Sequence, residues 1–145
     1  MSAQYQHTEF GYNYRMTDIS AAIGRIQLAK LDDFNTRRRE IAMAYNESLS
    51  EYVKIPKNRR GHVFHQYTIL CEKRDSLRSH LNSKGVGSGI YYPSLLYEYA
   101  PMSDFIADCP NAKRLTDTAL SLPVHPALSD SDVSKVIDAV ISFFD

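Results

Sequence analysis

The stretch from residue 17 to residue 49 constrains the fold most, because it contains no proline and its apolar residues recur at mostly helical spacing, beginning with Ile19 and Ile23. Thr17 or Asp18 can cap its start through a side-chain oxygen. We expect one long helix with room for a single bend. Such a helix would be about 50 Å long, whereas a compact domain of this size has a radius of gyration of about 15 Å. Part of it should therefore project or meet a partner.

Short strands and further helices are predicted after this helix. The expected elements are strands at 53–56, 62–71 and 86–92, helices at 74–84, 111–120 and from Ser129 or Asp130 onward, an irregular loop at 95–110 and a turn at 121–123. Gly85 can end the second helix in a left-handed conformation. Helices covering one face of a mainly antiparallel sheet make an α+β fold, and we expect the 145 residues to form a single domain.

Charge and cysteine content exclude several classes of protein. Seventeen basic residues balance seventeen acidic ones, which disfavours binding to nucleic acid or to an anionic membrane. Cys71 and Cys109 lie far apart, and the polar start of the chain does not resemble a secretory leader, so we expect a reduced, cytoplasmic setting. No apolar run approaches the roughly 20 residues that span a bilayer. The sequence predicts a soluble protein without a membrane partner.

Three groups of residues could carry chemistry. His62 and His65 stand near Cys71, but residues three apart in a strand point to opposite faces, so we expect no metal site. The arginines at 37–39 fan across about 200° of a helix, which favours a solvated or ion-paired face over a phosphate site. Tyrosines at 91, 92, 97 and 99 lie beside the small residues 87–89. This aromatic cluster is compatible with a ligand pocket and with core packing plus a subunit contact.

Several motifs occur in the order and spacing of one enzyme family. They are Gly11–Leu31, Arg38–Ala42 with Tyr45, His65–Tyr67, Arg74-Asp75 with Leu77, Gly85-Val86, Tyr91–Pro93, and Leu120–Pro123 with Pro126 and Leu128. In these motifs the chain resembles the DegT/DnrJ/EryC1/StrS family of pyridoxal phosphate (PLP) dependent sugar aminotransferases. The resemblance implies the C-terminal small domain of an aspartate-aminotransferase-like (fold type I) enzyme. Such enzymes are normally homodimers with active sites at the subunit boundary.

The resemblance also assigns roles to individual residues. Asn13 matches an asparagine that reaches the PLP phosphate of the neighbouring subunit, and the alternative is a turn residue before the helix. His7 and Arg15 flank it and would face the substrate, unless Arg15 pairs with a helix carboxylate. Tyr91 and Tyr92 match a loop that lines the sugar pocket.

Two differences from the family qualify these roles. The chain has Leu95 and Tyr97 where relatives often carry a proline and a histidine, so the usual substrates are not assured. The lysine that binds PLP belongs to the large domain in this family, which leaves this chain without a catalytic residue of its own.

The resemblance implies transfer of an amino group from glutamate or glutamine to a keto group on a nucleotide-linked sugar, for cell-surface polysaccharides or antibiotics. We expect PLP in the complete enzyme, none bound to this chain alone, and no activity from the chain alone. The alternative is a non-catalytic module that pairs with itself, as a dimer or larger assembly, or with a full-length relative. Binding to nucleic acid through the arginine run is disfavoured at zero net charge.

Overall fold

The computed structural model describes residues 9–105 and 107–145. The chain divides into two compact units, the first ending at Asp32 and the second comprising Asp33–Asp145. Within the described ranges, no helix is long and apolar enough to cross a bilayer.

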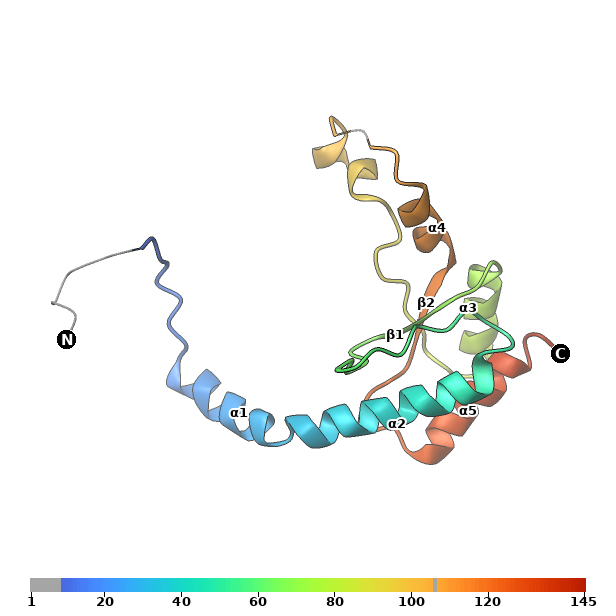
Figure 1. The fold of residues 1–145 in the computed structure, drawn as a ribbon, viewed down its shortest axis with the longest axis horizontal. Coiled ribbons are helices and arrows are strands. Elements are labelled where there is room, and N and C mark those ends of the chain that lie inside the picture. The colour runs from blue at the N-terminus through green and yellow to red at the C-terminus, as the bar shows by residue number, and fades with distance from the viewer. Residues whose placement is uncertain (1–8, 106) are drawn as a thin grey trace, which may run out of the picture. The chain divides into compact units, whose positions relative to one another are not determined.

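The first unit contains α1 (Asp18–Ala29), which buries none of its residues. Thr17 caps this helix, its hydroxyl accepting the backbone N–H of Ser20 at 3.3 Å. The expected continuous helix is interrupted once, at Lys30, whose N–H donates to the carbonyl of Gln27 at 3.1 Å and so tightens the last turn. A second helix, α2 (Leu31–Leu49), begins directly afterwards and extends into the second unit (Figure 1).

The sheet of the second unit is an antiparallel pair, β1 (Tyr67–Leu70) and β2 (Ala119–Leu122), in which Tyr67 lies opposite Leu122. An isolated bridge flanks it on each side, between Lys54 and Leu70 and between Gly89 and Ser121. The predicted strands at 53–56 and 86–92 are therefore reduced to single bridges.

Two predictions near this sheet were wrong. The strand expected from residue 62 begins only at Tyr67. The chain turns before it, because Phe64 has a left-handed φ of 48° and its N–H donates to Nδ1 of His62 at 3.0 Å. The helix and turn expected over 111–123 are instead α4 (Pro110–Thr118) followed at once by β2. The expected loop at 95–110 contains two short 3₁₀ helices, Leu96–Glu98 and Ala100–Met102.

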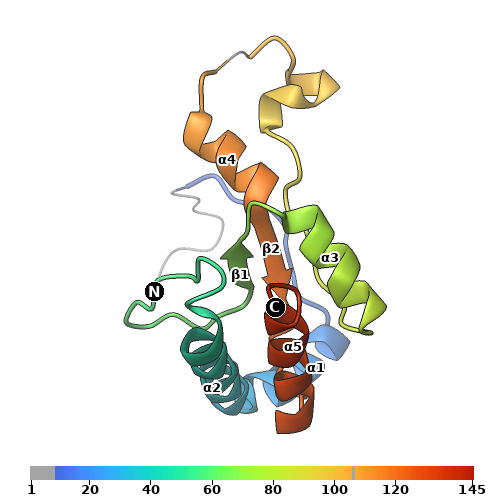
Figure 2. The same ribbon diagram turned by 90° about the vertical axis from the view of Figure 1, so that its right-hand side faces the viewer.

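Helices cover one face of the strand pair. That face carries Tyr67, Ile69, Leu120 and Leu122, all of them 3% exposed or less. They form one core with residues of α2, of α3 (Arg74–Ser83) and of α5 (Asp130–Ile141), which lie beside the strands in Figure 2. The antiparallel sheet and its helical cover agree with the expected α+β fold.

Local hydrogen bonds fix the ends of these helices. Gly85 has a φ of 73°, and the N–H groups of Gly85 and Val86 donate to the carbonyls of Asn82 and Leu81 at the end of α3. These are the two bonds of a Schellman motif, as the glycine predicted. Ser129 starts α5 with a reciprocal cap.

Candidate functional site

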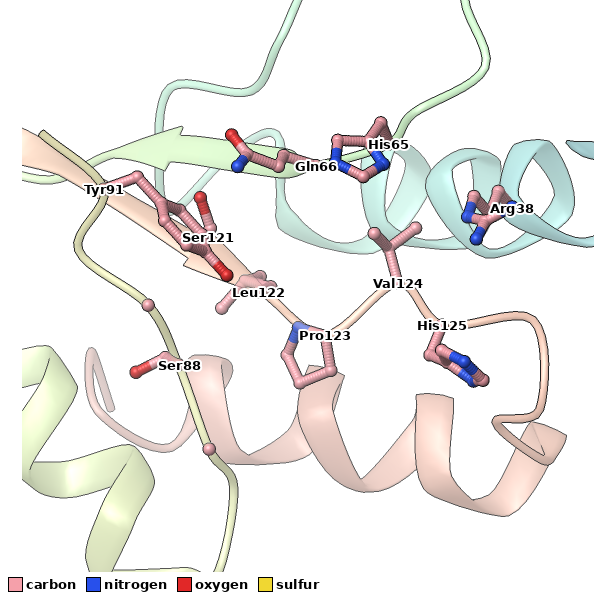
Figure 3. Close-up of a pocket in the computed structure, with 12 residues that line it drawn as sticks. Arg38, His65, Gln66, Ser88, Tyr91, Ser121, Leu122, Pro123, Val124 and His125 are labelled. Carbon is pink, nitrogen blue, oxygen red and sulfur yellow. The ribbon is translucent and has the colours of Figure 1, made fainter. Parts of the chain in front are cut away.

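A cavity of about 410 Å³ lies at one end of the strand pair (Figure 3). Four segments line it: α2 through Arg38, the residues just before β1, the segment 87–91, and the chain from Ser121 to His125. Because β1 and β2 are antiparallel, the start of the first and the end of the second meet at this edge. The topology thus brings together segments that lie more than 80 residues apart in the sequence.

Gly89 shapes the wall of this cavity. Its N–H donates to the carbonyl of Ser121 at 2.9 Å, and its own carbonyl accepts the N–H of Ser121 at 2.8 Å. A β carbon at Gly89 would lie only 2.9 Å from Cε2 of Tyr91. The ring of Tyr91 therefore packs directly against the glycine backbone, which the two hydrogen bonds hold in place.

A second cavity, of about 540 Å³, opens on the sheet face opposite the core that α2, α3 and α5 cover. Thr68 and Ser121 lie on its floor, their hydroxyls 2.7 Å apart. Its walls come from α4 and from the aromatic segment 91–99. Gln66, Tyr91 and Ser121 line both cavities, so Tyr91 stands where the two meet.

Tyr92 has an unusual backbone. Its φ is 59°, in the left-handed region that residues with a β carbon rarely adopt, and its side chain is 81% exposed. A strained backbone of this kind costs roughly 1–3 kcal/mol and is found preferentially at functional sites. The segment predicted to face a sugar is thus the one that combines strain, exposure and close packing on glycine.

Two of the other predicted site residues belong to the first unit and not to the second. Asn13 and Arg15 lie in the first unit, exposed and without regular secondary structure, in the segment that precedes α1. The ring of Tyr12 stacks on that of Tyr14 there, with centroids 5.2 Å apart. His7 lies outside the described residues. The roles assigned to Asn13, Arg15, Tyr91 and Tyr92 remain predictions.

The arginines at 37–39 have different surroundings, as expected for consecutive residues, which point in different directions around α2. Arg37 donates to the carboxylate of Asp130 at 2.7 Å and to the carbonyl of Leu128 at 2.8 Å. Arg39 donates to the carbonyl of His62 at 3.2 Å. Arg38 alone of the three lines the first cavity. The sequence showed the run of charge but not which member faces a cavity.

His65, Gln66 and His125 are further lining residues that sequence reasoning did not assign to this cavity. They come from segments that meet only through strand pairing. Cys71 is buried, and this burial raises the pKa of its thiol, so it is a poor nucleophile. Among residues 9–105 and 107–145 no group of three metal-binding side chains occurs.

Comparison with known proteins gives one consistent family. The family model for the DegT/DnrJ/EryC1/StrS aminotransferase family matches residues 1–141. Among curated proteins, a pleiotropic regulatory protein of Geobacillus stearothermophilus is 33% identical, with 97% of this chain and 40% of the relative covered. The GDP-perosamine synthase of Escherichia coli O157:H7 is 36% identical, with the same coverage. This chain therefore spans about 40% of the length of these relatives.

Solved structures agree with the sequence relatives. A DegT DnrJ EryC1 StrS aminotransferase from Brucella abortus superposes with a TM-score of 0.87 at 34% identity, covering 99% of this chain and 40% of its own. NtdA from Bacillus subtilis, solved with bound cofactor PMP, gives a TM-score of 0.84 at 25% identity and covers 94% of this chain and 34% of its own. The fold class expected from the sequence, part of a fold type I aminotransferase, is confirmed. The chain belongs to the DegT/DnrJ/EryC1/StrS aminotransferase family.

Proposed function

We propose that this chain is the C-terminal part of a PLP-dependent nucleotide-sugar aminotransferase and is inactive alone. The observation that carries the proposal is its coverage: the family match takes in residues 1–141, yet the chain spans about 40% of its relatives. The name of the GDP-perosamine synthase supports a nucleotide-linked sugar as the substrate. Glutamate or glutamine would supply the amino group, and the cytoplasm is the compartment we propose.

The residues of the first unit fit a role toward PLP. When bound, this cofactor supplies the electron-withdrawing ring through which an amino group is moved. The exposed Asn13 offers two amide N–H donors that match phosphate oxygens and add no charge. The exposed guanidinium of Arg15 can bind an anionic group of the substrate in two-point fashion. His7 completes the proposed set.

The Tyr91–Tyr92 loop would face the sugar. Two adjacent aromatic rings offer apolar faces to a pyranose and hydroxyl groups to its polar edge. The contact of the Tyr91 ring with Gly89 holds one of these rings in a defined position.

The first test is the size and activity of the native polypeptide. We expect an antibody against this chain to detect, in source cells, a protein about two and a half times as long, given the 40% coverage of relatives. That protein should catalyse PLP-dependent amino transfer to a nucleotide-linked keto-sugar, whereas the purified 145-residue chain should not. Transfer by the short chain, or a native protein of 145 residues, would contradict the proposal.

An Asn13→Ala substitution in that complete protein tests the cofactor contact. Loss of one hydrogen bond to a charged phosphate should weaken PLP binding roughly 10- to 100-fold, because such bonds contribute about 1.5–3 kcal/mol. The change is measured by titrating the apoprotein with PLP and following its visible absorbance. Asn58→Ala, also at an exposed asparagine, is the matched control and should bind PLP normally.

Self-association is a second candidate function. It is favoured by the exposed apolar side chains of α1, where Ile19, Ile23 and Ile26 are 59–76% exposed. We propose a homodimer, or pairing with a full-length relative. Sedimentation of the wild-type chain should show a dimer or larger species that the triple change of these isoleucines to Asp abolishes. A wild-type monomer at high concentration, unable to capture a full-length relative, would exclude this function.

A further inference from the structure

The cavity at the end of the strand pair is lined by basic side chains but by no acidic ones. Its lining includes Arg38, His65 and His125, and it contains no aspartate or glutamate. In the described part of the chain, Arg38 forms neither an ion pair nor a side-chain hydrogen bond, unlike Arg37 and Arg39 beside it. A guanidinium with free donors in a concave site is a good partner for an oxyanion.

His125 adds a donor to the same cavity. Its Nδ1 accepts the backbone N–H of Ala127 at 3.1 Å. In the neutral ring the proton is therefore on Nε2, which has no hydrogen-bond partner in the part of the chain that the structure describes. Figure 3 shows Arg38, His65 and His125 around Val124, at one end of the cavity.

The opposite end is polar and uncharged. Tyr91, Ser88 and Gln66 lie toward this end in Figure 3. The Ser88 hydroxyl is itself buried, so the Tyr91 hydroxyl and the Gln66 amide are the polar groups that a ligand can reach at this end. Hydroxyl and amide groups beside an aromatic ring suit the hydroxyl-rich surface of a sugar.

From this polarity we propose that the cavity binds a sugar joined to phosphate, with the phosphate at Arg38, His65 and His125 and the sugar toward Tyr91. The inference rests on the proposed function, since it assigns the phosphate-bearing part of the nucleotide-sugar to a particular site. Its volume of about 410 Å³ lies within the range of small-molecule sites, about 300–1,000 Å³. All the lining residues belong to the second unit, so binding can be measured on the 145-residue chain.

Binding can be tested by nuclear magnetic resonance on the 145-residue chain, titrated separately with inorganic phosphate and with glucose 1-phosphate, and then with L-glutamate in the presence of each. We expect saturable shifts at the rings of His65 and His125 with both phosphates, and at the Gly87–Gly89 amides with glucose 1-phosphate only. Glutamate should not displace them. Absence of saturable shifts with phosphate would overturn the proposal. Displacement by glutamate would also overturn it, by assigning the cavity to the carboxylate of the amino donor.

Two variants separate the ends of the cavity. Arg38→Gln should weaken inorganic phosphate and glucose 1-phosphate at least 10-fold, because it removes charge-assisted hydrogen bonds. Tyr91→Phe should weaken glucose 1-phosphate only, about 3- to 10-fold. Arg39→Gln is the matched control, since it removes the same charge one residue away and should change neither affinity more than 2-fold. Equal losses of affinity in Arg38→Gln and Arg39→Gln would show that only the net charge of the chain matters. That result would overturn the proposal.

The complete enzyme distinguishes this inference from the proposed function. There, Arg38→Gln should raise the KM for the nucleotide-sugar at least 10-fold and leave the KM for glutamate unchanged. Amino transfer with both KM values unchanged would overturn the inference and leave the proposed function intact. A complete protein that binds glucose 1-phosphate through Arg38 but transfers no amino group would overturn the proposed function alone.

Discussion

The unit that ends at Asp32 and the unit that begins at Asp33 carry similar apolar side chains but bury them to different extents. In α1, Ile19, Ile23 and Ile26 are 76%, 59% and 61% exposed. In the second unit, Ile69 is fully buried. The pattern of apolar spacing is helical in both α1 and α5, so spacing alone does not distinguish a helix that packs from one that does not.

The difference shows where the stability of this chain arises. Burial of apolar surface contributes about 25 cal/mol per Å², and the second unit gains this contribution within itself. α1 has 12 residues, a length at which an isolated helix is marginal in water. Its apolar side chains can stabilise the protein only when further protein covers them. The second unit thus contains a core of its own, whereas α1 contributes no buried residue.

The sharpest test of this comparison is the same substitution made in both units. Ile69→Ala should lower the free energy of unfolding by about 2–5 kcal/mol, because it removes a fully buried side chain and leaves a cavity. Ile23→Ala should change it by no more than about 0.5 kcal/mol, since that side chain is 59% exposed and alanine favours a helix. Urea denaturation of the two variants and the wild type measures both effects. Similar losses would show that α1 shares the core.

High pH should destabilise the second unit through two buried tyrosines. Burial raises the pKa of Tyr45 and Tyr67 well above the usual value of about 10. Because the unfolded chain loses these protons first, their contribution is fully present below about pH 10 and is lost as the pH rises beyond it. The measurement is urea denaturation at a series of alkaline pH values.

The variant Tyr45→Phe/Tyr67→Phe is the control for this pH effect. It also removes the hydrogen bonds from Tyr45 to the Pro123 carbonyl and from Tyr67 to Asn46, both 2.8 Å long, so it should be less stable at neutral pH. Its stability should nevertheless fall less steeply above pH 10. An unchanged slope would assign the alkaline loss to other groups.

Features that depend on neighbouring residues could be predicted from the sequence. The cap at Ser129, the left-handed end at Gly85 and the helices they delimit follow from local hydrogen bonds. Thr17 was one of two candidates for the first cap and is the one that the structure confirms. The break at Lys30 was allowed only as an unspecified bend, because nothing in its immediate sequence forbids a helix.

Features that depend on pairing between distant segments could not be predicted. β2 follows α4 without a loop. Its residues form a strand because they pair with Tyr67–Leu70, about 50 residues earlier in the sequence. For the same reason, nothing in the sequence indicated that Gln66 and His125 line the same cavity. The family motif singled out Tyr91, whose role remains a prediction, and the structure adds its packing against Gly89. The sequence thus indicated the loop but not the residues opposite it.

The two N-caps offer the finest test of the comparison, because they satisfy the same kind of backbone donor. Ser129 accepts the N–H of Asp132 at 3.2 Å, and Thr17 accepts that of Ser20 at 3.3 Å. Ser129→Ala should lower the free energy of unfolding by about 1 kcal/mol, since α5 belongs to the core. Thr17→Ala should reduce the helix content seen by circular dichroism and leave the unfolding midpoint unchanged. A shifted midpoint would mean that α1 unfolds together with the second unit.

The Ser129 cap also carries an acid dependence that can confirm its role. Hydrogen bonds from the Ser129 side chain and backbone lower the pKa of Asp132. A carboxyl group whose pKa is lower in the folded state stabilises the fold above its unfolded pKa, and this stabilisation is lost as the pH falls through the folded value. Ser129→Ala should therefore weaken the acid dependence of stability as well as its neutral-pH value. Thr17→Ala should alter neither, because the partner of the Thr17 hydroxyl among the described residues is Ser20 and not a carboxylate. Any change in acid dependence in that variant would show that the two helix starts are energetically linked.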